Sequence, residues 1–258
     1  MDPFKGLIDQ ELIRFEKRLD AVLEADVELV HDIARYMSTL KGKRLRPTLA
    51  LLSAKAAGDW NEKVIDAAVA REMIHAATMI HDDVVDSATM RRGRESINAR
   101  WTGQIAVLMG DFLLARALCI LVEVGNLQAL EIVSRATERL SVGEIFEIQI
   151  GDQRDAREES YFSMVSDKTA SLISAAARIG PILVGADDEI VRSMGRYGEL
   201  LGRAFQVADD ILDLTSDEAT MGKPVGHDLR EGKITLPLIC ALQCAPAARR
   251  AEIEASLA

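Results

Sequence analysis

The chain has 258 residues, of which 48% are hydrophobic, 28% are charged and 4% are aromatic. This composition supports a sizeable hydrophobic core and excludes a disordered chain, so we expect one large domain over residues 1–258, or at most two domains. The formal charge of −10 at pH 7 argues against nucleic acid as a partner, because a protein that binds a phosphate backbone usually carries a basic surface. An anionic ligand would therefore need local basic clusters or metal ions.

Apolar residues recur at spacings of three and four along most of the chain, which predicts an all-α fold. Pro47 suits the first turn of a helix that Gly58 can end, and Gly42 precedes a predicted loop at 43–46. The predicted helices cover residues 8–23, 26–40, 47–57, 62–86, 97–124, 127–150, 160–178, 188–214 and 234–244. Four glycines or prolines and many charges predict a loop over 215–233.

The two ends of the chain lead to separate expectations. The N-terminal residues 1–15 are amphipathic and lack the apolar core of a signal peptide. At the other end, residues 246–258 form an amphipathic helix without a cap, whose Ile253 and Leu257 need an apolar partner. We therefore expect that C-terminal helices are missing from this sequence.

The most apolar segment, residues 105–124, contains Asp111, Arg116 and Glu123. Charged residues are costly within a bilayer but ordinary in a buried helix, so we predict no transmembrane segment. The three cysteines form no CxxC pair, which disfavours a zinc site or a disulfide framework and fits a reducing, cytoplasmic location.

Two acidic motifs of the same form each end a long predicted helix and are each followed by basic residues. They are Asp82-Asp83-Val84-Val85-Asp86 and Asp209-Asp210-Ile211-Leu212-Asp213. In a helix the first and third aspartates of each motif share a face, and the middle one is rotated by about 100°. Paired carboxylates at the negative end of a helix dipole are unfavourable without a cation, which predicts divalent metal binding.

Gly198 and Gly202, one turn apart, predict close helix packing ahead of the second motif.

Oxygen ligands without nearby histidine or cysteine clusters favour Mg²⁺, which is typically held by one or two carboxylates plus substrate phosphates. Basic residues that could bind those phosphates are Lys43, Arg44, Arg46, Arg91, Arg92, Lys168, Lys223 and Lys233. This combination indicates a polyphosphate site bridged by metal. The alternative is that the acidic runs are solvated helix ends and the basic runs solvated loops, and the second copy of the motif argues against it.

With these residues the sequence resembles the trans-polyprenyl diphosphate synthases, long-chain enzymes of the octaprenyl and decaprenyl type with the isoprenoid-synthase fold. The matching motifs are GKRLRP at 42–47, HDDVVDSATMRRG at 81–93, GD at 110–111, DKTA at 167–170, FQVADDILD at 205–213 and GKPVGHDLREGKITLPL at 222–238. The resemblance covers nearly the whole chain. It implies an antiparallel helical bundle around a deep central cavity, Mg²⁺ as cofactor and a homodimer formed through helices like 105–124. A class I terpene cyclase would carry a different metal triad at the second motif.

The resemblance also implies roles for individual residues. The implied Mg²⁺ ligands are Asp82, Asp86 and Asp209, with Asp83, Asp210 and Asp213 in supporting positions. The implied contacts of the allylic diphosphate are Arg91, Lys168 and Lys233, and those of isopentenyl diphosphate are Lys43, Arg46, His75 and Arg92. Thr169 and Gln206 would lie beside the allylic carbons, and Lys223 would help to close a loop over the site. The implied reaction ionises the allylic C–O bond to a carbocation, which the isopentenyl double bond attacks.

Counting back from Asp82 at about 100° per residue, Ala70, Ile74, Ala77 and Thr78 fall on one side of the helix, beside the metal face. A growing prenyl chain would run along this chain-length wall. Short-chain members of the family close it with bulky aromatic residues, whereas Ala77 and Thr78 are small. We therefore predict an octaprenyl to decaprenyl product of the kind used in quinone side chains. One alternative is a shorter, farnesyl or geranylgeranyl product. The other is that these residues are small only to allow close helix packing.

Two other functions compete with this interpretation. The pairs Glu28/His31 and Glu72/His75 have the ligand spacing of di-iron bundles, but Glu28 points nearly opposite the apolar face of its helix. A non-catalytic subunit of a heteromeric synthase is the second alternative. Such subunits usually lose one acidic motif, and because both are intact here we favour an active enzyme.

Overall fold

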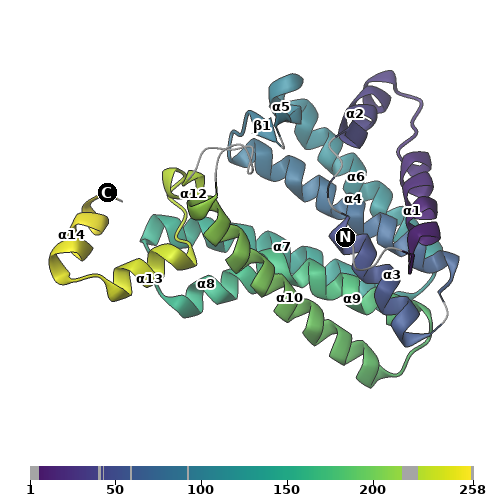
Figure 1. Cartoon of the computed structure of the whole chain (residues 1–258). Coiled ribbons are helices and arrows are strands. Elements are labelled where there is room, and N and C mark those ends of the chain that lie inside the picture. The colour runs from purple at the N-terminus through teal and green to yellow at the C-terminus, as the bar shows by residue number, and fades with distance from the viewer. Residues whose placement is uncertain are drawn as a thin grey trace. The chain divides into compact units, whose positions relative to one another are not determined.

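The structure is a computed structural model that describes residues 6–39, 42, 44–58, 60–91, 93–216 and 226–256 (Figure 1). Three residues with predicted roles, Lys43, Arg92 and Lys223, lie outside the described residues, as does Leu257. The described part of the chain is helical apart from one short hairpin, which confirms the predicted all-α class.

The elements follow the predicted order. They are α1 (Asp9–Val22), α2 (Glu28–Thr39), α3 (Leu45–Ala57), α4 (Glu62–Val85), β1 (Met90–Arg91), β2 (Arg94–Glu95), α5 (Ile97–Arg100), α6 (Gly103–Val124), α7 (Leu127–Gln153), α8 (Glu158–Val165), the π-helix η1 (Ser166–Ala170), α9 (Ser171–Leu183), α10 (Asp188–Thr215), α12 (His227–Arg230), α13 (Leu236–Cys244) and α14 (Ala247–Ser256).

Three local predictions need correction. The predicted helix 97–124 is broken into α5 and α6, because the Thr102 hydroxyl accepts a hydrogen bond from the Ile105 N–H and caps a new helix. The predicted loop 43–46 is shorter, since Leu45 already begins α3. The predicted loop 215–233 contains the short helix α12. The β1–β2 hairpin was not predicted, because strands of two residues carry no readable alternation.

The chain divides into two compact units, and the single domain expected from its length stays a prediction. Unit 1 consists of residues 1–135 and 172–198, and unit 2 of residues 136–171 and 199–258. The division falls within α7 and α10.

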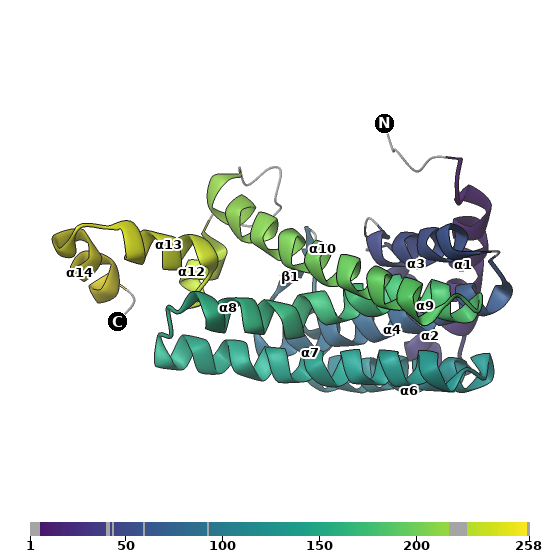
Figure 2. The ribbon, with the colours of Figure 1, turned by 90° about the horizontal axis from the view of Figure 1, so that it is seen from below.

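The core of unit 1 is built on α4, which makes its most extensive helix contacts with α6 and lies beside it in Figures 1 and 2. Small residues allow this close approach. At Gly110 of α6, an added Cβ would lie 2.2 Å from Nε2 of His81 on α4, so a larger residue here would require the His81 ring to move. This contact holds α6 against the last turns of α4, where the first acidic motif begins.

Helix α6 is also the one helix of the described chain that is long and apolar enough to cross a membrane by length and composition. One of its faces is buried and includes Met109, Leu113 and Leu121. This face packs into the core of unit 1, and the expectation that the segment does not cross a membrane stays a prediction.

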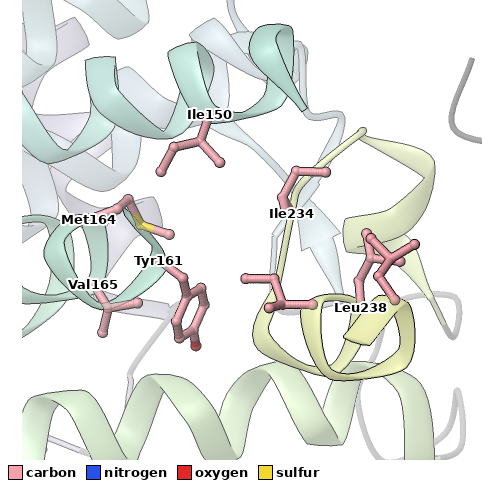
Figure 3. Close-up of a cluster of buried hydrophobic side chains, with 8 residues drawn as sticks. Ile150, Tyr161, Met164, Val165, Ile234 and Leu238 are labelled. Carbon is pink, nitrogen blue, oxygen red and sulfur yellow. The ribbon is translucent and has the colours of Figure 1, made fainter. Parts of the chain in front are cut away.

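Unit 2 has its own apolar cluster, formed by side chains of α7, α8, α13 and the segment before α13 (Figure 3). Its buried members are Ile150, Tyr161, Met164, Val165, Ile234, Leu238, Ile239 and Leu242. Close packing in this unit also uses Gly202 of α10, where an added Cβ would lie 2.5 Å from Cα of Ala170. The prediction for Gly202 is confirmed, and Gly198 approaches Cα of Ser174 in the same way within unit 1.

Candidate active site

The first acidic motif lies at the C-terminal end of α4, as predicted. Asp86 is the C-cap residue, and its N–H donates to the Asp82 carbonyl at 2.8 Å. Ser87 follows in the left-handed region with a φ of 50°, which ends the helix. Asp83 is 7% exposed, whereas Asp82 is half-buried and Asp86 is exposed. The outer two aspartates are thus more accessible than the middle one.

Arg91, from the β1–β2 hairpin, lies beside the middle aspartate of this motif. Its Nε is 3.7 Å from Oδ1 of Asp83, and its Nη2 is 2.7 Å from the sulfur of Met79. Burial raises the pKa of Asp83 above its ordinary value, and the nearby guanidinium opposes this shift. The structure therefore brings a predicted diphosphate-binding cation next to the first motif.

Two predicted isopentenyl diphosphate contacts also lie together in unit 1. Nη1 of Arg46, in the first turn of α3, is 2.8 Å from Nε2 of His75 on α4. Because a guanidinium can only donate, Nε2 accepts this hydrogen bond and the imidazole proton lies on Nδ1. The first turn of α3 thus presents a cation to α4.

Arg44, which directly precedes α3, uses its guanidinium for contacts with two glutamates of unit 1. Its Nε and Nη2 contact the carboxylate of Glu16 at 2.7 and 3.1 Å, and its Nη1 contacts Glu72 at 3.1 Å. The buried Arg71 contacts the other oxygen of Glu72 at 3.0 Å. Arg44 is therefore a structural residue here, although its sequence position made it a phosphate-binding candidate.

These contacts also bear on the di-iron alternative. Glu72 and His75 are each engaged by arginines, and Glu28 and His31 of the other pair are exposed on α2. Neither Glu-x-x-His pair forms a buried metal site in the described structure.

A cavity of about 130 Å³ in unit 1 is lined by α1, α2, α4, α6 and the hairpin region. Its lining includes three predicted site residues, His75, Asp83 and Arg91, together with apolar side chains such as Met79 and Leu113. It therefore combines charged groups with an apolar wall, as a site for an amphipathic ligand needs.

The predicted chain-length wall lies in the buried part of α4. Ala70, Ile74 and Ala77 are 0%, 1% and 2% exposed, and Thr78 is half-buried. The Thr78 hydroxyl donates to the carbonyl of His75 at 2.9 Å, within the helix. Three of these four residues, Ala70, Ala77 and Thr78, have small side chains, and the role of the wall in setting product length stays a prediction.

The second motif lies in the last two turns of α10, in unit 2. Asp209 is exposed, whereas Asp210 and Asp213 are each 3% exposed. Oδ2 of Asp213 accepts a hydrogen bond from the N–H of Asp228 at 3.3 Å, which ties α12 to the end of α10. Only the first aspartate of this motif is openly accessible, a difference from the first motif that spacing did not predict.

Asp210 accepts two side-chain hydrogen bonds. The Tyr161 hydroxyl donates to Oδ2 at 2.5 Å, and Nε2 of Gln206 donates to Oδ1 at 2.8 Å. Burial raises the pKa of Asp210 to about 6, although both hydrogen bonds act in the opposite direction. Tyr161 was missed by the sequence analysis, because nothing in its local pattern connects α8 to a motif on α10.

Lys168 and Thr169 lie in η1, a π-helical turn of a type that often marks functional sites. The Lys168 ammonium is 2.6 Å from carboxylate oxygens of both Glu144 and Glu147 on α7. Burial by itself lowers the pKa of Lys168, but the two glutamates outweigh it and raise the pKa above its ordinary value. The Thr169 hydroxyl donates to Oε1 of Gln206 at 2.8 Å, so these two predicted neighbours of the allylic carbons are in contact.

Lys233, the remaining predicted contact of the allylic diphosphate, has Nζ 2.8 Å from Oε2 of Glu231. It precedes Ile234, a member of the apolar cluster of unit 2. Each predicted allylic-diphosphate cation, Arg91 included, therefore has a carboxylate neighbour.

The donor set fits Mg²⁺ better than a metal that needs a complete protein cage. Among the described residues no group of three or more histidine, cysteine, aspartate or glutamate side chains is arranged to hold a metal ion. The motifs instead offer accessible carboxylates at Asp82, Asp86 and Asp209. Mg²⁺ typically takes one or two carboxylates and completes its shell with water and substrate phosphates.

Comparisons with known proteins show the family to which the chain belongs. Residues 27–258 match the family model described as polyprenyl synthetase. The chain is 40% identical over 252 residues to the all-trans-nonaprenyl-diphosphate synthase (geranyl-diphosphate specific) of Rhodobacter capsulatus, covering 97% of this chain and 77% of that protein. It is 40% identical over 242 residues to the octaprenyl diphosphate synthase of Escherichia coli, covering 94% and 75%.

Among solved structures, the chain is similar to the polyprenyl synthase from Caulobacter crescentus complexed with calcium and isoprenyl diphosphate. The TM-score is 0.93 at 35% identity, covering 97% of this chain and 76% of that one. The family model spans both acidic motifs and most of the residues described above. The chain therefore belongs to the polyprenyl synthetase family and is a trans-prenyltransferase, a polyprenyl diphosphate synthase.

Proposed function

We propose that this enzyme condenses isopentenyl diphosphate head-to-tail with an allylic diphosphate primer and releases a long-chain all-trans polyprenyl diphosphate, of the kind used in quinone side chains. The main observation in favour of a long-chain product is the small side chains of the α4 wall, where Ala70 and Ala77 precede the first motif. The names of relatives that make nonaprenyl and octaprenyl diphosphates support the same product class. The second candidate is a geranylgeranyl product, which the 38% identity to the geranylgeranyl diphosphate synthase of Methanosarcina mazei supports.

In this proposal Asp82, Asp86 and Asp209 hold Mg²⁺ together with the allylic diphosphate. The bound metal would supply positive charge that neutralises the departing diphosphate. Asp86 and Asp209 are exposed and Asp82 is half-buried, which supports their assignment as the metal ligands. Asp83, Asp210 and Asp213 then act in support, which agrees with their burial.

Cationic side chains bind the diphosphate groups in the proposed mechanism. Arg91, Lys168 and Lys233 contact the allylic diphosphate and stabilise the charge that grows on it as the allylic C–O bond breaks. Their carboxylate neighbours keep these cations ordered before substrate arrives. Lys43 and Arg92, which lie outside the described residues, complete the isopentenyl site with Arg46 and His75.

The reaction then needs a dry, oriented site. Arg46 and His75 hold isopentenyl diphosphate so that its double bond attacks the allylic carbocation, and the released diphosphate accepts the proton that is lost. Thr169 and Gln206 lie beside the allylic carbons. Apolar side chains of the α4 wall exclude water, which would otherwise quench the carbocation.

The proposal includes a homodimer formed through α6 and a cytoplasmic location. Apolar side chains on α6 such as Leu108 and Val122 are 60% and 66% exposed, which a second copy would cover. The three cysteines are all free, as in a reducing compartment. Sedimentation of the wild type and of Leu108→Lys tests the dimer. A monomeric wild type would contradict it.

The experiment that tests the function is incubation of the protein with Mg²⁺, farnesyl diphosphate and labelled isopentenyl diphosphate, followed by sizing of the dephosphorylated products. We expect a ladder that ends in a prenyl alcohol of the octaprenyl to decaprenyl range. Products that stop at geranylgeranyl would support the proposed condensation reaction and contradict the predicted long-chain product. Absence of Mg²⁺-dependent product would favour a non-catalytic subunit.

Ala77→Tyr tests the wall itself. The bulky ring would project from α4 beside the growing chain, so we expect a shorter final product while short primers still turn over. An unchanged product distribution would contradict the assignment of this wall.

A further inference from the structure

Four side chains of unit 2 form one continuous series of hydrogen bonds. It runs from the Tyr161 hydroxyl to Asp210, from Asp210 to the amide nitrogen of Gln206, and from the amide oxygen of Gln206 to the Thr169 hydroxyl. The three donor–acceptor distances are 2.5, 2.8 and 2.8 Å. The series therefore joins the apolar cluster of unit 2 to a residue that the proposed function places beside the allylic carbons.

The start of the series is rigid. Tyr161 is 1% exposed, and its ring lies among the cluster side chains with its hydroxyl directed toward α10 (Figure 3). The ring also makes an edge-to-face contact with Phe162, with centroids 5.2 Å apart. A tyrosine held in this way has little freedom to turn its hydroxyl away from Asp210.

The direction of each hydrogen bond follows from the chemistry of Asp210. An ionised carboxylate only accepts, so the Gln206 amide must turn its NH₂ group toward Asp210 and its oxygen toward Thr169. The Thr169 hydroxyl then donates its single proton to Gln206. Its oxygen lone pairs, and not its proton, remain for whatever lies on its other side.

This direction matters next to a carbocation. Oxygen lone pairs stabilise a nearby positive charge, whereas a hydroxyl proton pointed at it would destabilise it. We propose that Tyr161 is a positioning residue that acts through Asp210 to hold the Gln206 amide in one orientation, and so directs the lone pairs of Thr169 toward the allylic carbons. The inference rests on the proposed function for the placement of Thr169, and it assigns Asp210 to positioning because both of its oxygens already accept protein donors.

Tyr161→Phe is the first test, because it keeps the ring in the cluster and removes only the hydroxyl. We expect kcat to fall about tenfold while KM for both substrates changes less than about twofold, since ground-state binding does not depend on this series. Tyr197→Phe is the matched control, since this hydroxyl is removed from a residue that is 54% exposed. Unchanged kcat in Tyr161→Phe, with the wild type active, would overturn the inference and leave the proposed function standing.

Asp210→Asn is the second test and also serves if Tyr161→Phe does not fold. The new amide can still accept from Tyr161, but its NH₂ group would face Gln206 and force that amide to reverse. We expect kcat to fall about tenfold, and the Mg²⁺ concentration for half-maximal activity to stay within about twofold of the wild type. A large rise in that concentration would overturn the positioning role, because it would make Asp210 a metal ligand.

Two further measurements distinguish a positioning role of Tyr161 from a general structural role. The first is the double variant, and the second is the NMR signal of the Gln206 side chain. If Tyr161 acts through Asp210, the double variant loses no more kcat than Asp210→Asn alone. The side-chain NH₂ signals of Gln206 in an NMR spectrum, identified by their loss in Gln206→Glu, should shift in Tyr161→Phe and stay in place in Tyr197→Phe. Fully additive losses with an unmoved Gln206 signal would overturn the inference. A wild type without prenyltransferase activity would overturn the inference and the proposed function together.

Discussion

The two acidic motifs have the same spacing, yet their middle aspartates lie in different surroundings. Asp83, at the end of α4, has a cation beside it, with Nε of Arg91 at 3.7 Å. Asp210, on α10, has neutral donors, the Tyr161 hydroxyl and the Gln206 amide, at 2.5 and 2.8 Å. Both are buried, and burial raises the pKa of both.

The difference indicates that the shared spacing does not fix the surroundings of the middle aspartate. The contacts that hold this buried aspartate differ between the two units. Arg91 is 39% exposed in its side chain, so its support of the first motif is partly screened by solvent. The support of the second motif is a set of short, buried hydrogen bonds that depend on geometry. Substitutions in the two motifs should therefore have different consequences.

The largest expected losses of kcat follow from replacing the first aspartate of either motif. Asp82→Ala and Asp209→Ala each remove a proposed metal ligand, and we expect each to lower kcat by at least about 100-fold at saturating Mg²⁺. Product formation from farnesyl diphosphate and isopentenyl diphosphate measures this. If one variant kept more than about a tenth of wild-type turnover, the two first aspartates would not have equivalent roles.

Replacing the middle aspartate of each motif by asparagine should lower kcat by different factors in the two motifs. Asp210→Asn should lower kcat about tenfold because it disturbs two short hydrogen bonds. Asp83→Asn loses only a long, partly exposed ion pair, and we expect a loss of about threefold or less. Parallel measurements at one ionic strength test this order, and equal losses would contradict the distinction drawn between the two environments.

The pH dependence of stability provides a smaller effect. The pKa of Asp210 is raised from 3.8 to about 6 in the folded protein, so its protonated form favours folding below about pH 4 and that contribution is lost as the pH rises to about 6. Each pKa unit corresponds to about 1.4 kcal/mol. In metal-free buffer with chelator, the unfolding free energy of Asp210→Asn should therefore rise relative to wild type across this window.

Urea unfolding at a series of pH values measures the relative change, and Asp83→Asn serves as the comparison for a second buried carboxyl. A constant difference between Asp210→Asn and wild type from pH 4 to pH 6 would contradict the shift.

The smallest expected effect concerns the end of α4. Nδ2 of Asn98 donates to the carbonyls of Asp83 and Ala88 at 3.1 and 2.9 Å, which holds the chain where the first motif ends. Asn98→Ala should lower the unfolding free energy by about 1 kcal/mol. The control is Asn126→Ala, which removes the side-chain cap of α7. We expect both variants to lose stability and only Asn98→Ala to lose turnover, by about twofold. Equal turnover in both would contradict a role for Asn98 in holding the motif.

Local sequence patterns predict the helices and the two motifs, and the motifs indicate the family. Helices could be predicted because their apolar period is local, and the ends of α4 and α10 carry aspartates that a local pattern also reveals. The break between α5 and α6 was missed, although Thr102 is a good N-cap residue, because the apolar period continues on both sides of it.

The contacts that support each motif depend on how the helices pack in the folded chain. Tyr161 and Asp210 are 49 positions apart, Lys168 and Glu147 are 21 apart, and Arg44 and Glu72 are 28 apart. Hydrogen bonds and ion pairs of this kind depend on which helix faces pack together, and no local period carries that information. The local sequence pattern therefore indicates the candidate groups of the proposed active site, and helix packing determines which of them are exposed and which are buried.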